Sequence, residues 1–297
     1  MIFINYYDEI KNELVNNEIT KKVKDYSKNR SDLTTYYNVG KLLSEAGKHY
    51  GEGIIKEYSK RLTNEFGTKF GITLLKRIRQ FYIVIEKGAT MSHQLSWSHY
   101  CELLPVNSID KINYYIKITK EQNLSIRELR TKIKNNEYER LDESTKEKLK
   151  EKEELKVPDL VKNPIQIKNT SGNNEISEKV LQKLILEDIP SFLDELGNGF
   201  TFVRNEYKIK IGDRYNYIDL LSFNYEFNCF VVVELKVSEL KKEHIGQIEF
   251  YMNYIDKNLK NINQNKTIGI IICKKENNYI IEYCSDDRIL AREYELI

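Results

Sequence analysis

The sequence predicts two domains of different class, a mainly α-helical one followed by an α/β one with the element order αβββαβ. The chain has 297 residues, which leaves room for about two domains. Apolar residues recur at three- and four-residue spacing up to residue 157, whereas later segments alternate or form β-branched runs. We therefore expect a helical domain at residues 1–157 and an α/β domain at residues 158–297.

The first domain shows helical spacing of apolar residues in six segments, namely 5–28, 31–48, 51–66, 73–87, 108–122 and 125–136. Ser125 and Glu128 have the spacing of a capping box at the start of the last of these segments. Residues 142–157 are almost all charged and predict a solvated helix or a linker. Pro158 and Pro164 then interrupt regular structure, which sets the domain boundary near residue 158.

The second domain begins with a predicted helix that Pro190 can kink. Apolar strand patterns follow, then a second helix and two further strand patterns. In chain order the elements are a helix at 175–196, strands at 200–211, 217–223 and 229–237, a helix at 241–259, a strand at 267–274 and an edge strand at 279–284. A meander that leads into a crossover helix predicts a single sheet flanked by helices.

Composition and charge exclude several protein classes. No apolar run approaches the roughly 20 residues of a membrane span, and the N-terminus lacks a signal-peptide pattern, so we expect a cytoplasmic protein without membrane association. The four cysteines form no C-x-x-C pair and are expected to be free and mostly buried. Residues 1–157 carry 29 basic and 23 acidic side chains, and residues 158–297 carry 18 and 22. This asymmetry fits a nucleic-acid-holding module joined to a metal-binding module, or chance combined with coding bias.

The candidate catalytic residues are Asp219 and the tripeptide Glu234-Leu235-Lys236. The tripeptide ends a buried strand pattern, where a charge is costly unless it is paired or holds a metal. Strand alternation places Glu234 and Lys236 on one face, and a short connection brings the strand of Asp219 alongside. Two carboxylates and one ammonium can hold a divalent cation and orient a water. The alternative is a simple ion pair between Glu234 and Lys236.

Longer motifs resemble the YhcG family of bacterial PD-(D/E)xK nucleases. In the second domain they are Phe192-Leu193-x-Glu195-Leu196-Gly197-x-Gly199-Phe200, Tyr217-Ile218-Asp219-Leu220-Leu221, Val233-Glu234-Leu235-Lys236 and Gly246-Gln247. In the first they are Tyr50-Gly51, Leu62-Thr63-x-Glu65-Phe66-Gly67, Leu75-x-x-x-Arg79-Gln80-Phe81-Tyr82 and Leu95-Ser96-Trp97-Ser98-His99-Tyr100. The resemblance covers nearly the whole chain. It implies a winged-helix-like N-terminal domain and a restriction-endonuclease-like C-terminal core that hydrolyses phosphodiester bonds in DNA.

By this resemblance, Asp219, Glu234 and the backbone carbonyl of Leu235 ligate Mg²⁺, which Mn²⁺ can replace. Lys236 then orients or deprotonates the attacking water, or stabilises charge on the phosphorus. Gln247, on the crossover helix, positions Lys236 or the phosphate. These four side chains and one carbonyl make up the expected catalytic site.

The chain departs from the family pattern at two acidic positions. The family's first helix often has a Glu one turn after a leading acidic residue; these positions align with Gln182 and Glu178, so only Glu178 is a candidate accessory acid. The family usually has Gln where this chain has Glu206, so Glu206 is either a second accessory acid or a solvent-facing strand residue.

The candidate DNA-binding residues are four cations near the predicted fourth helix, Lys69, Lys76, Arg77 and Arg79. Together with the preceding helix they resemble a helix-turn-helix that directs cations toward phosphates. The alternative is a solvated amphipathic helix. DNA is the expected partner, a protein partner is possible, and a homodimer would most simply cut both strands. A non-catalytic DNA-binding or scaffold protein, or a partner-dependent subunit of a defence or restriction system, is the alternative function.

Overall fold

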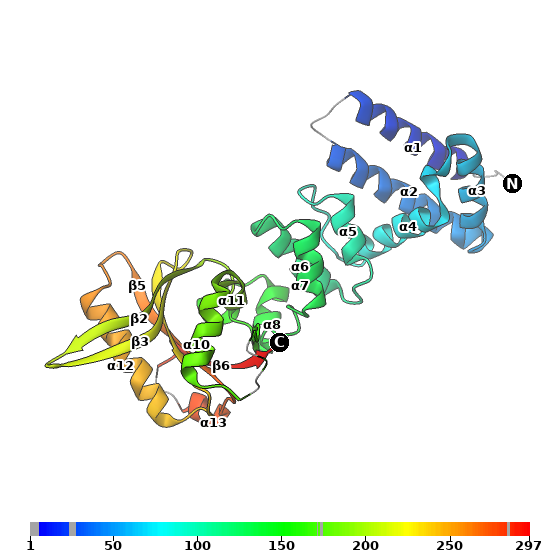
Figure 1. Cartoon of the computed structure of the whole chain (residues 1–297). Helices are drawn as coiled ribbons and strands as arrows, with labels where there is room; N and C mark the ends of the chain where they lie inside the picture. The colour runs from blue at the N-terminus through cyan, green and yellow to red at the C-terminus, as the bar shows by residue number, and fades with distance from the viewer. Residues whose placement is uncertain (1–5, 24–27, 171, 173–174, 284–285) are drawn as a thin grey trace. The chain divides into compact units, whose positions relative to one another are not determined.

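A computed structural model of the chain describes residues 6–23, 28–170, 172, 175–283 and 286–297 (Figure 1). The chain forms two compact units, Met1–Tyr138 and Glu139–Ile297. Residues 139–157, which the sequence pattern places in the first domain, therefore fold with the second unit. None of the helices in the described ranges combines the length and hydropathy needed to cross a membrane.

The first unit is built from helices. They are α1 (Tyr6–Val23), α2 (Lys28–Tyr50), α3 (Ile54–Phe66), the short 3-10 helix η2 (Thr68–Phe70), α4 (Ile72–Glu86), α5 (Trp97–Leu103), α6 (Ile109–Glu121) and α7 (Ile126–Lys134). All six predicted helices are present, although residues 5 and 24–27 of the first prediction lie outside the described part. The described residues of this unit contain no strand, so the wing of a winged helix is not found among them.

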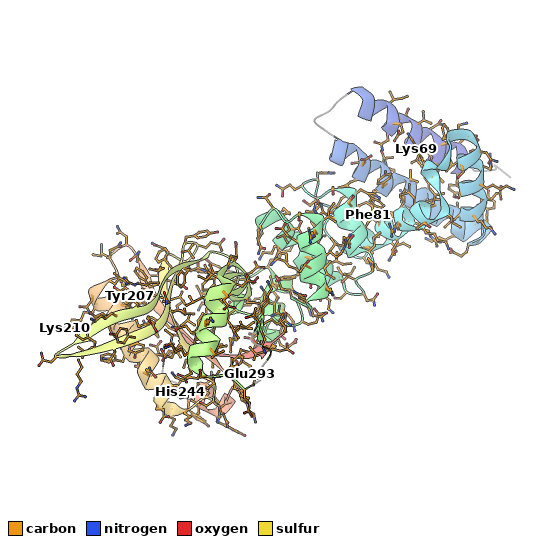
Figure 2. All side chains as sticks on the ribbon, viewed as in Figure 1. Lys69, Phe81, Tyr207, Lys210, His244 and Glu293 are labelled. Carbon is orange, nitrogen blue, oxygen red and sulfur yellow. The ribbon has the colours of Figure 1, made fainter. Side chains whose placement is uncertain are left out.

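Close approach of α2 and α4 organises this unit. A Cβ at Gly40 would lie 2.5 Å from the carbonyl oxygen of Ile78 and 2.6 Å from Cβ of Tyr82, so only glycine permits this contact. Phe81, labelled in Figure 2, is fully buried and packs edge-on against Trp97 at a centroid distance of 5.6 Å. The aromatic motif around Trp97 is therefore part of the core of this unit.

The second unit contains a six-stranded sheet with helices on both faces. Its elements are α8 (Glu143–Glu151), α9 (Val157–Leu160), β1 (Ile165–Ile167), α10 (Glu178–Glu187), α11 (Ile189–Leu196), β2 (Phe200–Ile211), β3 (Arg214–Asn224), β4 (Cys229–Leu235), α12 (Lys242–Asn258), β5 (Asn265–Cys273), α13 (Asn278–Glu282) and β6 (Ile289–Leu296). The strand order is β1-β6-β5-β4-β3-β2. Strands β2, β3 and β4 form an antiparallel meander, and β4, β5 and β6 run parallel. The predicted αβββαβ order is confirmed.

Two apolar clusters cover the two faces of this sheet. On one face Leu181 of α10 and Phe192 of α11 pack over the central strands. On the other face Ile248 and Met252 of α12 do so. A Cβ at Gly269 of β5 would lie 2.6 Å from the sulfur of Met252, so this glycine lets α12 approach the sheet closely. The result is an α/β/α sandwich with β4 at its centre.

Three local predictions differ from the structure. The helix expected at 175–196 is two helices, because Asp188 caps a new helix that begins with Ile189-Pro190. The edge strand expected at 279–284 is wrong, since this segment forms α13, and Cys284 lies outside the described residues. Two strands were missed: β6, which lies between β5 and β1, and the three-residue edge strand β1. The other expected strand cysteines, Cys229 and Cys273, are free and buried.

Candidate active site

Glu234 is held at the end of β4 by two donors that share one of its oxygens. Its side chain is nearly inaccessible, with a residue exposure of 2%, and Lys236 is 8% exposed. Nζ of Lys236 donates to Oε1 of Glu234 at 2.9 Å, and Nε2 of Gln247 donates to the same oxygen at 2.7 Å. The ion pair considered from the sequence is therefore present, and it includes a helix residue as a second donor.

Asp219 meets this group because of the register between β3 and β4. Leu220 pairs with Val233, which places Asp219 opposite Glu234. Oδ2 of Asp219 accepts a hydrogen bond of 2.8 Å from the backbone N–H of Leu235. Its backbone carbonyl accepts one of 3.1 Å from Nε2 of Gln182 on α10. The structure thus brings Asp219, Glu234, Lys236 and Gln247 together.

The second oxygen of Glu234 has no partner. In the part of the chain that the structure describes, three buried side-chain atoms lack a hydrogen bond: Nε of Arg79, Oγ of Ser222 and Oε2 of Glu234. A carboxylate oxygen is the costliest of these to leave unsatisfied, because it carries negative charge. Oε2 of Glu234 and the Asp219 carboxylate are donors of the kind that a small hard cation binds while it keeps several waters, and the carbonyl of Leu235 stays the expected third donor. Among the described residues, no three His, Cys, Asp or Glu side chains form a larger metal-ligand group.

Burial and nearby negative charge raise the pKa of both carboxyl groups. Burial and the nearby Asp219 carboxylate raise the pKa of Glu234 to about 7. Burial also raises the pKa of Asp219, against the opposing effect of the Leu235 N–H. For Lys236, burial acts to lower the pKa, but Glu234, Glu178 and Asp219 together raise it above its ordinary value. The site therefore favours a cation, which would compensate the two carboxylates.

The two candidate accessory acids occupy different positions. Glu178 lies in the first turn of α10, and its Oε2 is 3.8 Å from Nζ of Lys236. Glu206 is exposed on β2 between residues that pair with Leu220 and Ile218, so it stands across from Asp219. Its backbone φ is 46°, which is rare for a non-glycine residue and marks a local irregularity of the strand. Both acids act to raise the pKa of Asp219.

Tyr251 and His244 of α12 border the site; Phe250-Tyr251 is also part of the family resemblance, but no role was expected for Tyr251. Nε2 of Gln247 lies 3.2 Å from the hydroxyl of Tyr251, so the tyrosine supports the amide that holds Glu234. His244, labelled in Figure 2, is buried, with 6% of its surface exposed. Its Nδ1 accepts from the backbone N–H of Lys241, and burial together with Lys236 lowers its pKa. The spacing of Gln247 and Tyr251, one helical turn apart, was the available signal for Tyr251.

The four predicted DNA-binding cations do not form one cluster. Arg79 makes a two-pronged pair with Glu52, in which Nη2 lies 2.7 Å from Oε1. Lys69, in η2 and labelled in Figure 2, pairs with Glu18 of α1 at 3.0 Å. Lys76 acts on the same Glu52, which places it near Arg79. Arg77 instead interacts with Cys101 and Glu102 of α5. Two of the four charges are thus balanced within the unit.

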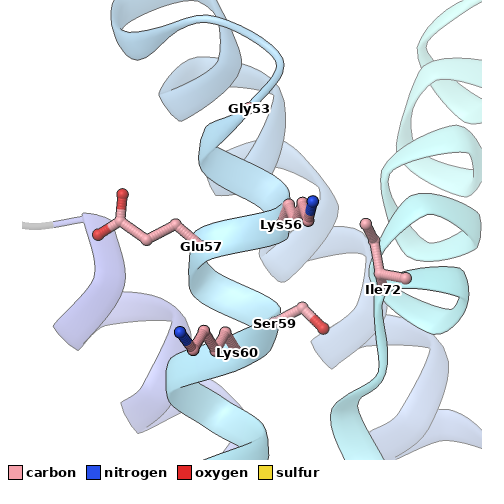
Figure 3. Close-up of a pocket in the computed structure, with 6 residues that line it drawn as sticks. All are labelled: Gly53, Lys56, Glu57, Ser59, Lys60 and Ile72. Carbon is pink, nitrogen blue, oxygen red and sulfur yellow. The ribbon is translucent and has the colours of Figure 1, made fainter.

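A hollow of about 540 Å³ lies beside α3 and the start of α4. Its lining, shown in Figure 3, consists of Gly53, Lys56, Glu57, Ser59, Lys60 and Ile72. Lys56 and Ser59 extend from α3 on the side of Ile72, and Glu57 and Lys60 extend away from it. The cations Lys56 and Lys60 of α3 line this hollow, and the acid Glu57 of the same helix also lines it.

Comparison with known proteins gives the following similarities. Residues 158–297 match the YhcG PDDEXK nuclease domain, and residues 9–140 match the DUF1016 N-terminal domain. The protein of Escherichia coli (strain K12) named "Putative nuclease YhcG" is 26% identical over 330 residues, which covers 95% of this chain and 88% of that protein.

Two solved structures show a weaker likeness. A repair endonuclease from Pyrococcus abyssi is 18% identical with a TM-score of 0.29, over 43% of this chain and 49% of its own. EndoMS in a complex with dsDNA is 18% identical with a TM-score of 0.29, over 43% of this chain and 48% of its own. The chain therefore spans about half the length of those solved chains.

Proposed function

We propose that this chain, which belongs to the YhcG family of PD-(D/E)xK nucleases, hydrolyses phosphodiester bonds in DNA with a divalent cation as cofactor. The observation that carries the proposal is the buried Oε2 of Glu234, which lacks a partner beside the Asp219 carboxylate. A purely structural ion pair would satisfy both oxygens, because an unsatisfied buried charge is costly. An arrangement that leaves one oxygen open is expected of a ligand.

The residues that would hold the cation are Asp219, Glu234 and the carbonyl of Leu235. We assign Mg²⁺ as the cofactor, with Mn²⁺ as a substitute, because all donors are oxygens. When bound, such a cation neutralises charge on the attacked phosphate and makes a water a stronger nucleophile near neutral pH. The chain itself must hold these oxygens in place, which Gln247, Gln182 and the Leu235 N–H do.

Lys236 acts as a hydrogen-bond donor and a positive charge in this scheme. The surrounding carboxylates raise its pKa, so the amine stays protonated at neutral pH. A protonated amine cannot remove a proton from water. It can orient the attacking water or stabilise negative charge that develops on the phosphate oxygens. Of the roles that the family resemblance implies for Lys236, orientation and charge stabilisation are favoured over general-base catalysis.

The first unit would hold the substrate or a protein partner. Lys76 and Arg77 of α4, with Lys56 and Lys60 beside the hollow, are the cations that support DNA contact there. We place the protein in the cytoplasm. A homodimer would be the simplest way to cut both strands of a duplex.

The test is incubation of the full chain with plasmid, linear and branched DNA in the presence of Mn²⁺ or Mg²⁺. Wild type should cut, and Lys236→Ala and Asp219→Ala should not. Calorimetry should show cation uptake that Asp219→Ala loses. Equal digestion by wild type and Lys236→Ala would indicate a contaminating nuclease and remove the proposed role of Lys236. Cation uptake without cleavage would favour a subunit that needs a partner protein.

A further inference from the structure

The outer half of the β2–β3 hairpin is a two-stranded arm. Strand β3 pairs with β4 only from Leu220 to Asn224, whereas it pairs with β2 along its whole length. Residues 214–219 therefore have a neighbour on one side only. In Figure 1 the far end of this hairpin extends beyond the other strands of the sheet. A two-stranded ribbon is only marginally stable alone, so it needs packing on one of its faces.

One face of the arm supplies that packing and the other face is exposed. Ile209 and Ile218 are fully buried in the apolar cluster that includes α12. On the opposite face Lys208 pairs with Tyr217, and Lys210 pairs with Tyr215, so these four side chains share one side. Both tyrosines are 52% exposed. Figure 2 shows Lys210 near the free end of the hairpin.

The cations of the arm are not neutralised by acids. Within the described part of the chain, no carboxylate lies within ion-pair distance of the exposed Arg204, Lys208, Lys210 or Arg214, although Glu206 and Asp213 belong to the same hairpin. Nζ of Lys208 instead lies 3.7 Å from the centroid of the Tyr215 ring. The arm thus differs from α4, where Arg79 is already paired with Glu52.

We propose that Tyr215, Tyr217, Lys208 and Lys210 form a binding face for single-stranded DNA that leads the strand to Asp219. This inference rests on the proposed nuclease function and names its substrate class. Exposed aromatic rings stack on bases without sequence preference, and the lysines between them can contact phosphates. A duplex hides the faces of its bases within the stack, so rings of this kind favour an unpaired strand.

The position of the arm connects this face with the catalytic residues. Tyr215 and Tyr217 are about 7 Å apart along β3, which lets each ring take its own base. Asp219 follows Tyr217 at the same spacing on the same strand. A strand bound along the arm would therefore pass from the rings to the carboxylates without crossing another element.

The experiment measures binding of a fluorescein-labelled oligothymidine to the full chain by anisotropy, in EDTA so that no cleavage occurs. The variant Tyr215→Ala/Tyr217→Ala should bind about tenfold more weakly or worse, because neither ring is left to stack on a base. Tyr215→Phe/Tyr217→Phe keeps the rings and should bind within about twofold of wild type. Tyr279→Ala, at a tyrosine of α13 that is 77% exposed, is the matched control and should bind as wild type does.

Two further measurements locate the binding face if the first unit dominates the affinity. Lys208→Gln/Lys210→Gln should reduce the salt slope of binding by about 0.7 for each phosphate that the variant no longer neutralises. Photocrosslinking with 5-iodouracil in the same oligonucleotide should attach it to the peptide that begins at Tyr215. Unchanged affinity and salt slope in the arm variants, with crosslinks only elsewhere, would overturn the inference. Tighter binding of duplex than of oligothymidine, unchanged when both tyrosines are replaced by alanine, would also overturn it.

Failure of this inference can be told apart from failure of the nuclease proposal. If the protein cuts DNA with Mn²⁺ but its arm variants bind and crosslink as wild type does, only the proposed binding face on the arm is contradicted. A protein that binds oligothymidine through the arm, but cuts no substrate with any cation, contradicts the nuclease proposal and leaves the binding face in place.

Discussion

Nε2 of Gln247 and Oε1 of Glu234 are 2.7 Å apart, which joins the crossover helix α12 to the end of strand β4. The same oxygen accepts from Lys236, so both donors lie on one side of the carboxylate. This arrangement fixes the rotation of the carboxylate and leaves Oε2 open. Gln247 thus acts on Glu234, whereas the family resemblance suggested that it positions Lys236 or the phosphate.

Gln247→Ala should weaken Mn²⁺ binding by roughly 10- to 100-fold, the usual effect of losing a group that orients a metal ligand. Calorimetry on the full chain measures this affinity. Gln166→Ala, at the edge strand β1, removes the same side chain far from the site and should bind as wild type does. Equal affinity in wild type and Gln247→Ala would show that the amide does not orient Glu234.

In EDTA, wild type should lose more stability between pH 5 and pH 8 than Glu234→Gln does. The folded-state pKa of Glu234 is about 7, above the ordinary value of 4.5, so the fold favours the neutral form. Stability linked to this group is fully present below about pH 4.5 and is lost as the pH rises through 7. A neutral glutamine avoids this loss, which amounts to roughly 1–3 kcal/mol.

Thermal unfolding of wild type and Glu234→Gln from pH 5 to pH 8 measures that difference. The melting temperature of wild type should fall further between pH 5 and pH 8 than that of Glu234→Gln. Glu249→Gln, on the same helix as Gln247, serves as the control for removal of a carboxylate. A melting temperature that falls equally with pH in wild type and Glu234→Gln would contradict the assignment of a raised pKa.

Affinity for Mn²⁺ should fall as the pH is lowered through 7. Below that pH the proton on Glu234 must leave before the carboxylate can act as a ligand, so affinity should drop by up to tenfold per pH unit. Calorimetry at pH 6 and pH 8 tests this, and buffers of different ionisation enthalpy report the released proton. Identical affinities at the two pH values, with no proton released at pH 6, would count against it.

Charge removal on α4 should separate two kinds of cation. Lys76→Gln and Arg77→Gln should each lower the salt slope of duplex DNA binding by about 0.9 if each contacts one phosphate. Arg79→Gln should lower thermal stability instead, because it leaves Glu52 without its partner. Filter binding at several salt concentrations and thermal unfolding measure the two effects. A large loss of DNA affinity in Arg79→Gln alone would reverse this assignment.

The meeting of Asp219, Glu234 and Lys236 was predictable from the sequence because its spacing is set by local rules. Alternation placed Glu234 and Lys236 on one face, and a short hairpin brought Asp219 opposite Glu234. Strands β6 and β1 were not predictable in this way. Strand β6 reads Ile-Leu-Ala-Arg-Glu-Tyr-Glu-Leu, whose charges hide the strand pattern, and β1 has only three residues. Tertiary packing decides such segments, as it does for the apolar α13.

The sequence likewise could not predict that Oε2 of Glu234 lacks a partner, or which cations of α4 pair with acids. Both depend on which side chains approach from elements far apart in the chain, such as Glu52 toward Arg79. The raised pKa of Glu234 also depends on burial depth, which no motif encodes. Sequence patterns therefore predicted which side chains lie together at the end of β4, but not the shifts of their pKa values.

Ion pairs made by Arg140 and Asp142 decide where the chain can be divided to obtain the second unit alone. Nη2 of the buried Arg292 donates to Asp142 at 2.8 Å, and Arg140 forms a two-pronged pair with Glu195 on α11. A fragment that starts at Pro158 would lack Arg140 and Asp142, and loss of the buried Arg140–Glu195 pair alone would cost about 3–5 kcal/mol. A fragment that starts at Glu139 keeps both ion pairs and should be the more stable protein for crystallisation.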